Sequence, residues 1–214
     1  MPSITGAPTA LISVFYKDGL DSLAQALVDK GYTLLSTGGT RKFLEDLGHK
    51  VEAVEDLTSY PSILGGRVKT LHPKVFGGIL GRRNLDSDIA EMNEFEIPSI
   101  DVVVVDLYPF EETLASGASH QDIIEKIDIG GISLIRAAAK NYNDTWIIPS
   151  REYYAQALEV LTSDSLNEEV RKQFAAAAFR ISSAYDTHIQ AYLSGNYQNL
   201  ILGQEHPLRY GENP

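Results

Sequence analysis

Short apolar runs alternate with amphipathic segments along the first part of the chain. Residues 9–15, 33–36 and 51–54 form short, largely apolar runs that are typical of buried strands. Between them, apolar residues recur at helical spacing over 20–28 and 43–47, and a glycine follows each segment, as it often does at helix ends. Strand, helix, strand, helix, strand is the pattern of a parallel sheet with crossover helices.

The next hundred residues extend this pattern. The run 101–108 contains four consecutive valines and predicts the most strongly buried strand, while 146–148 predicts another. The spacing predicts helices over 89–95 and 132–140. Residues 75–80 are predicted to form a short irregular or strand-like piece.

Beyond Ser150 the apolar spacing is helical only, over 153–161 and 166–193. We therefore predict an α/β core over 1–150 and a helical extension over 151–214, which together make one structural domain.

Composition narrows the class of protein. The 214 residues carry a formal net charge of −11, with a pI near 4.8, which argues against a general nucleic-acid or membrane-surface binder. There is no cysteine, so disulfides, thiolate metal sites and a cysteine nucleophile are excluded, and a cytoplasmic protein is expected. No apolar run reaches the ~18 residues of a membrane helix. The first residues show no secretory signal.

Positive charge is concentrated in one glycine-opened stretch. Residues 57–85 contain five Lys or Arg and no Asp or Glu, so this window is at +5 and the rest of the chain at −16. Within it, residues 65–74, which we call the basic loop, carry Arg67 and Lys69 and predict an anion site. A solvated basic loop is the common alternative, but the absence of acids and the opening glycine pair favour function.

The predicted strand ends supply further candidates, because ligands of open parallel sheets bind beyond the carboxyl ends of the strands. Lys17 follows the first strand and the turn 36–40 follows the second. This Ser-Thr-Gly-Gly-Thr turn suits a phosphate, since glycines let the backbone approach and the next helix offers free N–H groups. It lacks the Gly-Lys-Ser/Thr ending of a Walker motif. An ordinary turn with Thr40 as helix cap explains it equally well.

Asp128 and Tyr108 are candidates for proton transfer and charge stabilisation. Asp128 lies between two isoleucines just before a predicted helix. It is either a carboxylate stabilised by the helix dipole or a general base in an apolar setting. Tyr108 at a strand end is either a half-buried rim residue or a donor to developing charge. The histidines show no ligand spacing, so no metal site is predicted.

Four separated stretches, 65–73, 106–110, 127–141 and 208–214, together resemble the inosine monophosphate (IMP) cyclohydrolase family. This family forms the N-terminal half of a bifunctional purine-biosynthesis enzyme, whose other half is a transformylase. The resemblance extends from about Ala10 to the last residue, and its final stretch resembles the junction into the transformylase half.

The resemblance implies a methylglyoxal-synthase-like fold with a mostly parallel sheet and helices on both faces. It implies a nucleotide substrate and the closure of 5-formamidoimidazole-4-carboxamide ribonucleotide to IMP with loss of water. No cofactor and no metal are expected for this reaction. The family also implies a cytoplasmic homodimer and, in a longer protein, a covalently linked transformylase domain.

The resemblance also implies roles for particular residues. Lys69 resembles the lysine near the formyl oxygen, and Tyr108 the tyrosine beside it. Asp128 resembles the carboxylate that takes the carboxamide proton, and Lys140 the lysine that donates or accepts a proton. The implied substrate-binding positions are Ser13, Lys17, Thr37, Gly38, Gly39, Thr40, Arg67, Val68, Thr70, Asp106, Ile129 and Gly130.

Some positions depart from the family pattern, and one pair of implied catalytic residues lies far apart along the chain. Phe15 and Tyr16 replace a Ser-Asp pair, and Asp106 replaces an asparagine that often precedes Leu-Tyr-Pro-Phe, which puts a carboxylate beside an anionic ligand. Asp128 and Lys140 are twelve residues apart, or about 18 Å along an unbroken helix. Direct contact between them therefore predicts a helix that is interrupted before Lys140.

Two other functions share the predicted fold. One is a regulatory nucleotide-binding module, and the other is a methylglyoxal synthase acting on a triose phosphate. The basic loop and the Asp128–Lys140 pair favour the cyclohydrolase, because a binding module needs only the phosphate turn.

Overall fold

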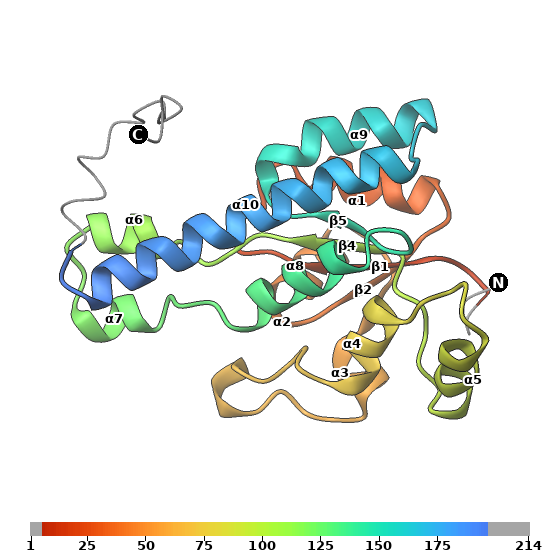
Figure 1. Cartoon of the computed structure of the whole chain (residues 1–214), viewed down its shortest axis with the longest axis horizontal. Coiled ribbons are helices and arrows are strands. Elements are labelled where there is room, and N and C mark those ends of the chain that lie inside the picture. The colour runs from red at the N-terminus through yellow and green to blue at the C-terminus, as the bar shows by residue number, and fades with distance from the viewer. Residues whose placement is uncertain (1–5, 197–214) are drawn as a thin grey trace, which may run out of the picture.

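The computed structural model describes residues 6–196 (Figure 1). The stretch 208–214, which resembles the junction to a transformylase, lies outside the described residues, as does the last part of the predicted extension. None of the described helices is both long and apolar enough to cross a membrane.

Five parallel strands form one sheet in the order β3-β2-β1-β4-β5. They are β1 (Thr9–Ser13), β2 (Thr33–Ser36), β3 (Val51–Ala53), β4 (Val102–Val105) and β5 (Trp146–Ile148). The predicted fold class and all five strands are confirmed. However, β1 and β4 end a few residues before the ends of the apolar runs that predicted them. The residues after these two strands leave the sheet and line a pocket instead.

Strand order reverses direction at β1, and this places helices on both faces of the sheet. The chain passes from β1 to β2 and β3 on one side, and from β1 to β4 and β5 on the other. Since parallel crossovers are right-handed, the two halves carry their helices on opposite faces. The helices α1 (Leu20–Asp29) and α2 (Gly38–Asp46) belong to the first half, and α8 (Gly130–Lys140) to the second.

The C-terminal helices pack onto this core. α9 (Tyr154–Ser163) lies against α1, and the long α10 (Glu168–Leu193) packs against α8 and β5. The far end of α10 reaches α6 (Phe110–Ala115) and lies between it and α7 (His120–Ile124) (Figure 1). The residues predicted as a helical extension therefore contact both the sheet and the segments that follow β4.

The prediction of an irregular or strand-like piece at 75–80 is wrong, because these residues belong to the helix α4 (Pro73–Leu80). His72 caps this helix, its Nδ1 accepting the Lys74 amide hydrogen at 3.1 Å. Gly77 and Gly78 lower the helical propensity of the segment. A Cβ on Gly78 would meet the Pro98 carbonyl oxygen, so the glycines allow a close approach that a propensity argument does not see.

The other short elements surround the sheet. They are α3 (Val54–Thr58), the 3₁₀ turns η1 (Leu64–Gly66) and η2 (Arg151–Tyr153), and α5 (Asp86–Glu94). The helix predicted over 89–95 is confirmed by α5, and the one over 132–140 by α8.

The predicted interruption before Lys140 is wrong. α8 continues without a break to Lys140, because the alanines at 137–139 favour a helix and are buried against the core. Lys140 is exposed at the end of α8, whereas Asp128 precedes its beginning. At about 1.5 Å per residue the two residues lie at opposite ends of this helix.

The side chain of Phe174 joins α10 to the sheet. Phe174 is 1% exposed and packs edge-on against Trp146 of β5, with ring centroids 5.2 Å apart. We expect Phe174→Ala to lower the free energy of unfolding by about 3–5 kcal/mol, because it opens a cavity in the core. Urea unfolding measures this effect. Phe179→Ala, on the same helix but 40% exposed, should cost less than about 1 kcal/mol. Equal costs for the two variants would contradict the described packing of α10.

Candidate functional site

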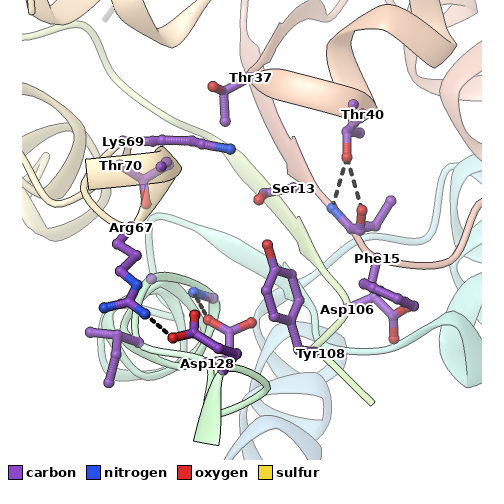
Figure 2. A pocket seen from close by; sticks show the side chains of 18 of the residues that line it. Ser13, Phe15, Thr37, Thr40, Arg67, Lys69, Thr70, Asp106, Tyr108 and Asp128 are labelled. Carbon is purple, nitrogen blue, oxygen red and sulfur yellow. Dashed lines mark hydrogen bonds and ion pairs between the residues drawn. The ribbon is translucent and has the colours of Figure 1, made fainter. Parts of the chain in front are cut away.

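A pocket of about 870 Å³ opens at the carboxyl ends of β1, β2 and β4 (Figure 2). It lies where the strand order changes direction, which is the usual place for a ligand in an open parallel sheet. Two further segments complete its wall, the basic loop and the connection from α7 to α8. Elements far apart in the sequence are thus combined in a single cavity.

Most of the predicted site residues line this pocket. They are Ser13, Lys17, Thr37, Gly39, Thr40, Arg67, Lys69, Thr70, Asp106, Tyr108, Asp128, Ile129 and Gly130. Three predicted residues do not line it. Gly38 begins α2 with φ of 55°, Val68 forms an isolated antiparallel bridge with Ile63, and Lys140 is at the far end of α8. No group of acidic or histidine side chains suited to a metal ion is present in the part of the chain that the structure describes.

The glycine turn is fixed to the end of β1 by Thr40. The Thr40 hydroxyl donates to the carbonyl of Val14 at 2.9 Å and accepts from the Val14 amide at 3.2 Å. The Thr37 hydroxyl donates to Glu55 at 2.5 Å. These bonds hold the first turn of α2 at the pocket, where its free backbone N–H groups can bind an anion.

Lys69 lies against the two glycine-rich segments of the pocket. A Cβ on Gly66 would lie 2.8 Å from the Lys69 ammonium nitrogen, and a Cβ on Gly38 would lie 3.1 Å from it. Among residues 6–196 no carboxylate lies within 4.0 Å of this ammonium group. Its charge is therefore available to an anionic ligand or to a developing oxyanion.

The other cations of the acid-free window are paired with acids outside it. Lys74 lies 3.9 Å from Glu96, Arg82 lies 2.8 Å from Asp88, and Arg83 lies 2.5 Å from Asp101. None of these three cations lines the pocket. Arg67 does line it, and pairs there with Glu125, which is not among the predicted site residues.

Asp128 is held in the pocket by the beginning of α8. Its Oδ1 accepts a hydrogen bond from the Gly131 amide at 2.7 Å (Figure 2). A Cβ on Gly131 would lie 2.6 Å from Oδ2, so only glycine allows the carboxylate this position. Burial raises the pKa of Asp128, against the opposing effect of nearby backbone N–H groups. A fixed carboxylate whose basicity is increased is suited to act as a general base.

Asp106 and Lys17 both line the pocket beside the end of β1 and interact electrostatically. Asp106 accepts the Tyr16 amide hydrogen at 3.0 Å, and burial raises its pKa against the opposing effects of this bond, of Arg151 and of Lys17. The Lys17 ammonium donates to the Val14 and Phe15 carbonyls at 2.5 and 3.0 Å, and burial lowers its pKa. The carboxylate that seemed unexpected in the sequence thus organises the loop after β1.

Aromatic side chains form one wall of the pocket. The rings of Phe15 and Tyr108 lie 5.4 Å apart and edge-on, and the Lys126 ammonium lies 5.6 and 5.8 Å from their centroids. Tyr108 is 43% exposed, and its hydroxyl points into the pocket (Figure 2). Phe15, a departure from the family pattern, therefore contributes surface against which a planar ligand could pack.

Several lining residues were not proposed from the sequence. They are Val14, Phe15, Leu64, Gly65, Gly66, Ile124, Glu125, Ile127 and Gly131. Four of them, Val14, Gly66, Ile127 and Gly131, are immediate neighbours of proposed residues along the chain, and Gly65 and Gly66 are the glycine pair that opens the basic loop. Nothing in the sequence pattern indicates that Glu125 pairs with Arg67, since the two residues lie 58 positions apart.

Residues 19–133 match the model of the MGS-like domain family, and the chain belongs to this family. Residues 138–214 match a second family model, described as the AICARFT/IMPCHase bienzyme. The two matches together begin after β1 and extend to the last residue, so they include most of the pocket residues but not Ser13, Val14, Phe15 or Lys17.

Individual relatives agree with these matches. The chain is 56% identical to a bifunctional purine biosynthesis protein PurH of Bacteroides thetaiotaomicron, over 96% of this chain and 42% of that protein. A PurH of Clostridioides difficile is 45% identical, with the same coverage. The chain thus spans about two fifths of the length of these relatives. The crystal structure of ForH superposes with a TM-score of 0.73 at 35% identity, over 88% of this chain and 98% of that one.

The raised pKa of Asp128 predicts a stability gain on neutralising this residue. The ionised carboxylate opposes folding at any pH above the folded pKa, because the folded state binds this proton more tightly than the unfolded state. Asp128→Asn removes the charge and keeps an oxygen that can accept from Gly131. We expect a larger free energy of unfolding than wild type at pH 7.

Urea unfolding over a range of pH measures this difference. The gain should shrink as pH falls through the folded pKa, and it should vanish below the unfolded value of about 3.9, where wild type is protonated in both states. A variant that is less stable than wild type at pH 7 would show that the charged carboxylate stabilises the fold.

Proposed function

We propose that this domain closes the ring of 5-formamidoimidazole-4-carboxamide ribonucleotide to give IMP and water. The observation that carries the proposal is the arrangement of Asp128, Lys69 and the first turn of α2 around one pocket. The PurH relatives and the match to the AICARFT/IMPCHase bienzyme support this reaction over the two alternatives that share the fold. A homodimer, and a covalent link to a transformylase domain, remain predictions.

The nucleotide phosphate binds at the first turn of α2 in this proposal. The backbone N–H groups there are free, Gly39 has no neighbour within 4 Å of a would-be Cβ, and Thr37 and Thr40 line the pocket. Arg67 and Thr70 bind the sugar-phosphate from the opposite wall. Arg67 must then exchange its contact with Glu125 for the ligand, since a bound phosphate is the stronger partner for a guanidinium.

The ring lies between Asp128 and the aromatic wall. An amide nitrogen is a weak nucleophile until it loses a proton, and Asp128 accepts that proton as the carboxamide nitrogen attacks the formyl carbon. Lys69 and Tyr108 donate to the formyl oxygen as it gains negative charge. This oxygen then takes up two protons and leaves as water. The former formamido nitrogen loses its hydrogen, and the double bond forms between this nitrogen and the former formyl carbon.

Positioning supplies a large share of the rate, because both reacting groups belong to one molecule and need only be held in contact. Lys140 has no place in this proposal, since it does not line the pocket and lies at the opposite end of α8 from Asp128. The proton transfers fall instead to Asp128, Tyr108 and Lys69.

The experiment that tests the function follows ring closure directly. The formylated ribonucleotide is mixed with the protein, and the ultraviolet change of ring closure is recorded over time. We expect a rate well above the spontaneous rate, and no acceleration would defeat the proposal.

Two variants from the basic loop make this test specific. We expect Lys69→Ala to lower kcat by roughly a hundredfold, because it removes a donor to the oxyanion. Lys74→Ala is the matched control and should keep wild-type turnover, since Lys74 faces Glu96 outside the pocket. A Lys69→Ala variant with raised KM and unchanged kcat would instead assign Lys69 to uniform ligand binding, for example of the phosphate.

A further inference from the structure

Tyr185 of α10 bonds to the backbone on both sides of Ile127. Its hydroxyl donates to the Lys126 carbonyl at 2.7 Å and accepts from the Asp128 amide at 2.9 Å. The side chain is 7% exposed, so these bonds are shielded from water. They join residues 57 and 59 positions apart, and they connect the C-terminal helix directly to the backbone of the proposed general base.

A small second core surrounds this contact. Phe110, Ile123 and Tyr185 are buried together, and Leu107 and Ile127 pack against them. The rings of Phe110 and Tyr185 lie 6.0 Å apart in an edge-on arrangement. The segment that carries Tyr108 and the segment that carries Asp128 are therefore both held against the same end of α10.

Asp128 needs such an external tether because it lies in an irregular connection. α7 ends at Ile124 and α8 begins at Gly130. After α7, the Lys126 and Ile127 amides still donate to the carbonyls three residues earlier, as in a turn. The Asp128 amide bonds to Tyr185, while its carboxylate bonds to Gly131. One tether fixes the backbone from α10, and the other fixes the side chain from α8.

We propose that Tyr185 is a positioning residue for ring closure, which holds Asp128 where its carboxylate meets both the Gly131 amide and the substrate. The inference rests on the proposed function, since it takes Asp128 as the base of that reaction. Tyr185 does not line the pocket, so it acts through Asp128 and not on the substrate. The competing explanation is a purely structural one, in which the hydroxyl satisfies two backbone groups and affects stability alone.

The electrostatic surroundings of Asp128 determine what a displacement would do. Backbone N–H groups of Gly131, Tyr108 and Ile132 lower its pKa against the effect of burial. The titratable and charged side chains that share the pocket with this carboxylate, contact its aromatic wall or act on its tether Tyr185 are Lys17, Arg67, Lys69, Asp106, Tyr108, Glu111, Glu125, Lys126 and Asp186. Movement of the Asp128 backbone away from these N–H donors would raise the pKa of its carboxyl further.

The test compares two tyrosines of α10 that both pack against Phe110. Tyr185→Phe removes only the hydroxyl that bonds to the Asp128 segment. Tyr192→Phe removes a hydroxyl that bonds to the His120 ring nitrogen at 2.7 Å, away from the pocket. We expect Tyr185→Phe to lower kcat by roughly tenfold to a hundredfold, because small displacements of a catalytic group have effects of this size. Tyr192→Phe should leave kcat unchanged.

Two measurements distinguish a positioning role of the Tyr185 hydroxyl from an effect on protein stability alone. In Tyr185→Phe the acid limb of the pH–rate profile should move to higher pH, because that limb reports the pKa of the base. A titration of the Asp128 carboxyl carbon by NMR, assigned with Asp128→Asn, should show the same upward shift, and thermal unfolding confirms that each variant is folded. A folded Tyr185→Phe protein with wild-type kcat and an unchanged Asp128 titration would overturn the inference.

The NMR readout also keeps the two proposals distinct. If the wild-type protein does not accelerate ring closure, the proposed function fails. The Asp128 titration still tests, by itself, whether Tyr185 positions Asp128. An upward shift in Tyr185→Phe and none in Tyr192→Phe supports it, and equal titrations in all three proteins reject it.

Discussion

The carboxylate of Asp128 accepts the Gly131 amide hydrogen at the beginning of α8, and the geometry of the site depends on this bond. It requires a glycine at 131, because any Cβ there would collide with the carboxylate. It also requires the Asp128 backbone to stay in place, which the hydroxyl of Tyr185 provides from α10. Burial raises the pKa of Asp128, and the same bond that orients its carboxylate partly offsets this cost of keeping a charge beside the pocket.

The pocket also depends on close approaches that only glycine permits. Lys69 lies over Gly66, whose φ is 88°, and near Gly38, whose φ is 55°. Both glycines have a positive φ that other residues rarely adopt, and Gly66 also leaves the space that the Lys69 side chain occupies. The close approach of Lys69 to these glycines brings its ammonium group beside the positive end of α2. Both therefore face the same cavity as the carboxylate of Asp128, in a protein whose net charge is strongly negative.

The strands and most of the site could be predicted from the sequence, because buried parallel strands give apolar runs and ligands bind where those runs end. The glycine turn and Tyr108 were identifiable on that rule, and Asp128 from its place between two isoleucines before a predicted helix; the family resemblance indicated all three. The helix α4 was missed because Gly77 and Gly78 reduce local propensity, whereas the structure uses them for close packing against residues 97–100. The contacts of Glu125 and Tyr185 join positions more than fifty residues apart, and no local pattern encodes such pairings.

A structure of the protein with IMP bound would show directly whether Asp128 reaches the reacting nitrogen, since IMP is the product of the proposed reaction. We expect the phosphate on the backbone amides of the first turn of α2, with the base against Phe15 and Tyr108. The Asp128 carboxylate should lie within hydrogen-bond distance of the ring nitrogen that comes from the carboxamide. A base bound elsewhere, with Asp128 making no contact with that nitrogen, would show that Asp128 is not the base of this reaction.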